Sequence, residues 1–159
     1  MSKNPYIAIL IQSLRKKEQV LDSISIINQR QKTELEDPSL DPDDFDKTVE
    51  EKAKLIAELE KLDDGFDEVF QKVRDDLTNH KEEYRDEIKT MQELIRSLTA
   101  KSATVQGQEA RNKVLMEQKF TAIKDQVRKV RSSQKVVNQY YQNMMKVNLV
   151  DPQFTDSKK

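Results

Sequence analysis

Apolar residues in the first part of the chain recur at steps of three and four, the spacing of one face of an α-helix. The repeat is close to seven residues, and it runs through Ile7, Leu10, Leu14, Leu21, Ile24 and Leu35. Two positions on the same track, Lys17 and Asn28, are polar. Asn4 followed by Pro5 predicts the start of this helix, because Asn caps free N–H groups and Pro loses no hydrogen bond at the first position.

An acidic connection separates this helix from a second one. Pro38 disfavours a helical residue before it, so we expect the first helix to end at Asp37. Asp41 with Pro42 repeats the capping start. The second stripe runs through Phe45, Val49, Ala53, Ile56, Leu59, Phe66, Val69, Phe70, Val73 and Leu77. Gly65 lies inside it, where we expect it to be tolerated or to mark a slight bend.

A third stripe follows a turn that we predict at Thr78 and Asn79. Asn79 would cap the helix, with Glu82 and Glu83 in its first turn. The stripe runs through Tyr84, Ile88, Met91, Ile95, Leu98, Val105, Leu115, Phe120, Ile123, Val127 and Val130. It thins at residues 101–109, where Ser, Thr and Gly replace strong helix formers. The third helix therefore either continues through this stretch, or kinks or turns there.

Three long helices with short connections predict an all-α fold, an extended antiparallel bundle. The composition agrees, because 36% of residues are charged and only two are glycine, which suits helices with a solvated face. The 159 residues suffice for one domain, which we place at residues 1–150. We expect the polar tail 151–159 to be disordered.

Charge and composition exclude several classes of function. The 28 basic and 29 acidic residues nearly cancel, so we expect no binding to nucleic acid or membranes. The absence of cysteine excludes disulfides and thiolate metal sites. No apolar run approaches the roughly 20 residues of a membrane span, and Ile7–Ile11 is too short for a signal peptide. We therefore expect a cytoplasmic protein without a cofactor.

The charge is nevertheless unevenly distributed. Residues 36–68 include 14 acidic and four basic side chains, whereas residues 111–146 include nine basic and two acidic ones. The basic stretch would suit a nucleic-acid surface. It lacks the interleaved aromatic residues of a base-stacking platform. We favour the alternative in which the basic helix packs beside the acidic one.

Catalytic chemistry has no candidate residues. The chain holds one histidine, His80, and no cysteine, and no glycine-rich phosphate loop is present. His80 lies near Glu82 and Glu83, but one such pair is not a metal site, and we interpret it as a solvated or turn-lining residue. The aspartates of DPDDFD lack the glycine and closing glutamate of a calcium loop. We predict that the protein is not an enzyme.

The most informative segment spans residues 134–147. Apolar residues arrive there in adjacent pairs every three to four positions: Val136, Val137, Tyr140, Tyr141, Met144 and Met145. We call these six residues the C-terminal stripe. No charged residue lies between Lys135 and Lys146, and Tyr and Met are typical of protein interfaces. A partner-binding surface is favoured over ordinary core packing of the last helix.

Together, these features resemble the flagellar export chaperones of the FlgN/FliT type. The resemblance lies in the first helix (IAILIQSLRKKEQVLDSISIINQRQ), in the acidic turn with the second helix (DPDDFDKTVEEKAKLIAELEKLDDGF), and in AIKDQVRKVRSSQKVVNQYYQNM. It implies binding of late substrates, hook-filament junction proteins for FlgN-type members or the filament cap for FliT-type members. It also implies delivery to the type III export gate. The resemblance further implies that the client-binding region of the family, its C-terminal helix, corresponds here to the C-terminal stripe.

Two alternatives remain beside this expectation. The same stripe would make a permanent homodimer if the protein were a coiled-coil scaffold or tether. Alternatively, a hinge at residues 100–109 would fold the last helix back over its own bundle. The stripe would then be masked until a client competes for it.

Overall fold

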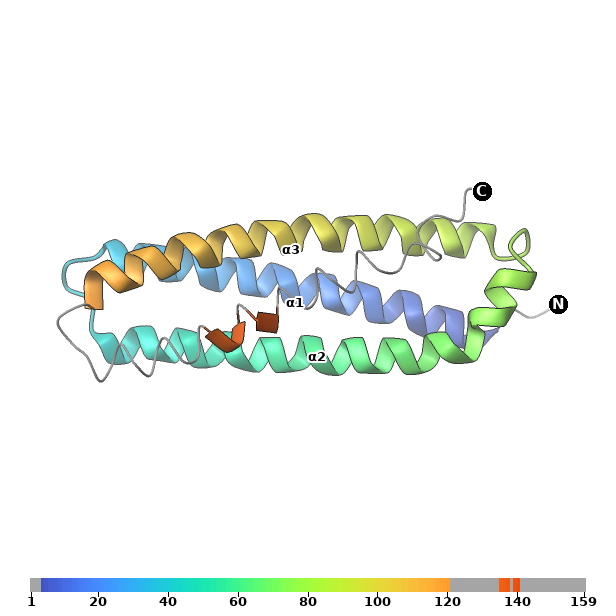
Figure 1. Cartoon of the computed structure of the whole chain (residues 1–159), viewed down its shortest axis with the longest axis horizontal. Coiled ribbons are helices and arrows are strands. Elements are labelled where there is room, and N and C mark those ends of the chain that lie inside the picture. The colour runs from blue at the N-terminus through green and yellow to red at the C-terminus, as the bar shows by residue number, and fades with distance from the viewer. Residues whose placement is uncertain (1–3, 121–134, 138, 141–159) are drawn as a thin grey trace.

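The computed structural model describes residues 4–120, 135–137 and 139–140. Within them, three long helices follow one another: α1 (Pro5–Glu36), α2 (Pro42–Asn79) and α3 (Arg85–Phe120). α2 runs antiparallel to both α1 and α3, and the three form an elongated bundle (Figure 1). The closely packed pairs are α1 with α2 and α1 with α3. The predicted all-α bundle of three long helices is confirmed.

Both predicted capping starts are present. The Asn4 side-chain oxygen accepts a hydrogen bond from the Tyr6 backbone N–H at 3.0 Å, and the Asp41 carboxylate accepts one from the Asp43 N–H at 3.0 Å. α1 ends at Glu36, and Asp37 is its extended C-terminal cap, as the following proline predicts. These starts and this end are set by local chemistry.

The second turn lies later than the sequence suggests. α2 continues through Gly65 to Asn79, and residues 80–84 form the turn, so the predicted cap at Asn79 is wrong. The buried side chain of Tyr84 holds this turn, because its hydroxyl oxygen accepts a hydrogen bond from the Asn4 backbone N–H at 3.1 Å. The first-turn acids of α3 are Asp86 and Glu87.

α3 does not break at residues 101–109. Ser102 is fully buried, and its hydroxyl donates a hydrogen bond to the Leu98 backbone oxygen at 2.7 Å. Lys101 forms ion pairs with Glu18 at 3.4 Å and Asp22 at 2.8 Å on α1. Packing against α1 therefore outweighs the weak helix propensity. Of the two possibilities that the sequence left open, the structure has the continuous helix, and α3 has no hinge in this stretch.

The core consists of two apolar clusters along the bundle. The larger includes Ile7, Leu10, Leu14, Leu21, Ile24, Ile56, Leu59, Val73, Leu77, Tyr84, Met91, Leu98 and Val105. The smaller includes Leu35, Phe45, Val49 and Met116. One expected core position is wrong: Ala53 is exposed, and its neighbour Lys52 is fully buried instead.

Candidate partner-binding site

The C-terminal stripe is only partly within the described residues. Val137 and Tyr140 are buried, with 0% and 8% of their surface exposed, and both belong to the larger apolar cluster. Val136 is 61% exposed. Tyr141, Met144 and Met145 lie outside the described residues, as do the tail 151–159 and most of the basic stretch. Two of the six predicted residues are thus buried against the protein's own bundle.

A polar contact anchors this segment to the bundle. The Tyr140 hydroxyl donates a hydrogen bond to one carboxylate oxygen of Asp63 on α2, at 2.7 Å. The other Asp63 oxygen accepts a hydrogen bond from the Lys17 ammonium of α1, at 2.5 Å. Asp63 therefore joins three parts of the chain, and its side chain is 35% exposed. Lys17 was one of the two polar positions on the first apolar track.

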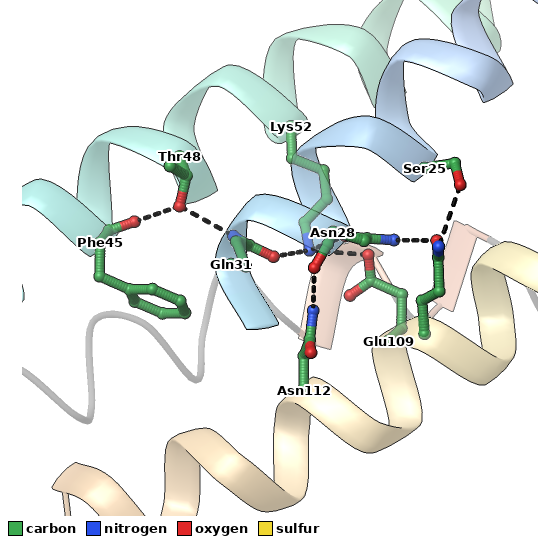
Figure 2. Close-up of polar contacts among 9 residues, drawn as sticks. Ser25, Asn28, Gln31, Phe45, Thr48, Lys52, Glu109 and Asn112 are labelled. Carbon is green, nitrogen blue, oxygen red and sulfur yellow. Dashed lines mark hydrogen bonds and ion pairs between the residues drawn. The ribbon is translucent and has the colours of Figure 1, made fainter. Parts of the chain in front are cut away.

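A second polar assembly lies between the two apolar clusters, and we call it the polar layer. At its centre is the fully buried ammonium of Lys52, which donates hydrogen bonds to Asn28 at 2.9 Å and Gln31 at 2.8 Å (Figure 2). It also pairs with the Glu109 carboxylate at 2.7 Å. Burial lowers the pKa of Lys52, and the adjacent Glu109 opposes this shift.

The rest of the polar layer consists of side-chain amides and hydroxyls that bridge the helices. Asn28 donates to Gln108 at 3.1 Å, and Gln108 donates to Ser25 at 3.0 Å. Asn112 donates to the Asn28 backbone oxygen at 2.9 Å, as Figure 2 shows. Polar groups with such specific partners fix the position of each helix along its neighbours. A shift of one helix along its axis would leave buried polar groups without their partners. The layer therefore sets the register of the bundle.

Sequence patterns gave a partial signal for this layer. Asn28 interrupts the first apolar track, which indicated a polar position on the buried face. Nothing in the sequence indicated that Lys52 and Glu109 are buried. Charged residues are almost never fully buried unless they are paired, so such side chains are ordinarily expected at the surface. Their burial depends on a partner from a different helix.

An open apolar groove lies between α1 and α2. It has a volume of about 660 Å³, and its lining residues include Leu10, Leu62, Phe66 and Val69. Phe66 also stacks on Phe70, with ring centroids 6.0 Å apart. This groove was not predicted, because its residues belong to the core stripes and their flanks.

The described residues contain no group of three histidine, cysteine or acidic side chains that could hold a metal ion. His80 is exposed and caps the C-terminal end of α2. Among the helices in the described part of the chain, none is long and apolar enough to cross a membrane.

The comparison with protein families shows which family the chain belongs to. A family model described as FlgN protein matches residues 1–146, which includes all three helices and the whole C-terminal stripe. The chain belongs to the FlgN family. It is therefore a flagellar export chaperone, and the choice between FlgN and FliT that the sequence pattern left open falls to FlgN. No curated protein and no solved structure gives a significant match to this FlgN-family chain.

Proposed function

We propose that this FlgN-family chaperone binds the amphipathic terminal helix of late flagellar substrates in the cytoplasm. Hook-filament junction proteins are the expected clients, and the filament cap is the alternative that FliT-type chaperones suggest. The chaperone keeps the client soluble and delivers it to the type III export gate. The observation that carries this proposal is that the family match extends to residue 146 and so includes the uncharged C-terminal stripe.

The chemistry of the stripe suits a helix as the ligand. Val, Tyr and Met side chains at helical spacing offer an apolar face without charged residues between Lys135 and Lys146. An amphipathic client helix would lay its own apolar face on them, the mode in which helices bind in grooves. Methionine adapts to partners of varied shape, which suits a chaperone with more than one client.

Co-expression with candidate clients from the same organism tests the proposal. The intact chain and a chain ending at Ser133 would each be expressed with the hook-filament junction proteins and the filament cap, then separated by gel filtration with light scattering. We expect a stoichiometric complex only with the intact chain. Circular dichroism should show that the shortened chain keeps most of its helix, since α1, α2 and α3 all end before Ser133.

Two results would overturn this proposal. A shortened chain that still forms the complex would move the client site to the bundle. An intact chain that binds no client and is a stable dimer at every concentration would favour the scaffold instead.

A further inference from the structure

The described part of the C-terminal stripe faces its own bundle. Val137 exposes none of its surface and Tyr140 exposes 8%, and both lie in the larger apolar cluster of the bundle. Figure 1 shows residues 135–137 and 139–140, in orange-red, near α2, to which Tyr140 is hydrogen-bonded through Asp63. A side chain buried in this way cannot contact a client at the same time. Client binding through the stripe therefore requires these residues to leave the bundle.

The contact between Tyr140 and Asp63 is the specific part of this packing. Apolar contacts tolerate many arrangements, whereas a hydrogen bond from a hydroxyl to a carboxylate fixes one donor against one acceptor. Lys17 occupies the other oxygen of the Asp63 carboxylate and holds that side chain in place from α1. The acceptor for Tyr140 is thus positioned by the bundle before the segment arrives.

We propose that Tyr140 and Asp63 form an intramolecular latch that holds the client-binding segment closed, and that a client helix competes with the bundle for Val137 and Tyr140. This inference rests on the proposed function. When only a fraction of molecules is open, the apparent dissociation constant for the client is the intrinsic one divided by that fraction. Weakening the latch therefore strengthens client binding without adding any contact to the client.

The variant Tyr140→Phe tests the latch directly. It removes the hydroxyl but keeps the aromatic ring for the client and leaves the Lys17–Asp63 pair intact. Tyr6→Phe is the matched control, because Tyr6 is a partly exposed tyrosine at the start of α1. In the free protein, we expect amide hydrogen exchange at residues 135–140 to become roughly three- to tenfold faster with Tyr140→Phe, the range for losing a partly exposed hydrogen bond to a charged group.

Client binding is the second measurement. A synthetic peptide of the terminal helix of a hook-filament junction protein is titrated into each variant by calorimetry. We expect Tyr140→Phe to bind it more tightly, by the same factor as the gain in exchange rate, and Tyr6→Phe to bind as the unmodified chain does. Asp63→Ala removes the acceptor of the same hydrogen bond and should also tighten binding of the peptide. Its control is Asp64→Ala at the exposed neighbouring position.

The outcomes separate the latch from the proposed function. If Tyr140→Phe leaves hydrogen exchange unchanged, or speeds exchange without tightening the peptide, the latch is refuted while the stripe remains the client site. If the chain ending at Ser133 binds the peptide as well as the intact chain, the stripe is not the client site. In that case the proposed function and the latch are both overturned.

Discussion

The ammonium of Lys52 lies 2.7 Å from the carboxylate of Glu109, and neither side chain exposes more than 2% of its surface. This pair connects α2 to α3, although both helices pack mainly on α1. Two opposite charges in an apolar interior are favourable only when each has close partners, since their desolvation cost is large. Asn28 and Gln31 supply further oxygen partners for the ammonium.

Removing one member of this pair should destabilise the bundle strongly. We expect Glu109→Gln or Lys52→Met alone to lower the free energy of unfolding by about 3–5 kcal/mol, because each leaves a buried charge without its partner. The double variant Lys52→Met with Glu109→Leu should cost less than either single change. Urea unfolding followed by circular dichroism measures these differences.

Lys54→Met is the matched control for those variants, because Lys54 is exposed on the same helix. It should change the stability by less than about 0.5 kcal/mol, as most surface substitutions do. Single variants of the pair that behave like this control would show that the polar layer does not depend on charge pairing.

Glu34 should make the stability depend on pH. Burial raises the pKa of its carboxyl group; Arg30 opposes this shift, and Asp44 and Glu51 add to it. The folded chain therefore holds this proton to higher pH than the unfolded chain does. Stability from Glu34 is present at low pH and is lost as pH rises from about 4.5 through the raised value.

We therefore expect Glu34→Gln to raise the melting temperature at pH 7, and to raise it less or not at all below about pH 4.5, where the carboxyl group of Glu34 is protonated in both states. Differential scanning calorimetry at several pH values measures both effects. Glu36→Gln is the control, because Glu36 is exposed on the same helical turn. Equal pH profiles for the intact chain and Glu34→Gln would contradict this prediction.

Replacing Gly65 by alanine should stabilise α2. A Cβ atom built there meets nothing within 4 Å, and glycine is less favourable than alanine inside a helix by about 0.8–1.0 kcal/mol. Thermal unfolding should show a gain approaching this size. The reverse change, Ala57→Gly at another exposed position of α2, should cost a similar amount. A loss of stability in Gly65→Ala would mean that the glycine is needed for another reason.

Local chemistry explains which parts of this fold were predictable. The capping pairs Asn4–Pro5 and Asp41–Pro42 act on their own helix ends, so the sequence alone located both starts correctly. The turn after α2 was misplaced because Tyr84 holds it through a contact with Asn4, far away in the sequence. Local patterns contain no information about such a contact.

The candidate site was less predictable for the same reason. The pairing of apolar residues drew attention to the C-terminal stripe, but Tyr140 is buried with its hydroxyl bonded to Asp63, which in the sequence looks like one more acidic side chain on α2. Likewise, Lys52 gives no local sign of burial without Glu109. The weak helix formers in α3 left open whether that helix continues, because propensity alone does not reveal how those residues pack on α1.

The place of α1 between the other two helices also has a consequence for synthesis of the chain. Its hydrogen bonds to α3 join residues 79 to 84 positions apart, such as Lys101 with Asp22 and Asn112 with Asn28. On the ribosome, α1 can pair with α2 early, but it must wait for α3 to emerge before its other side is covered. During synthesis, this chaperone is therefore expected to pass through a stage at which one side of its own first helix is still uncovered.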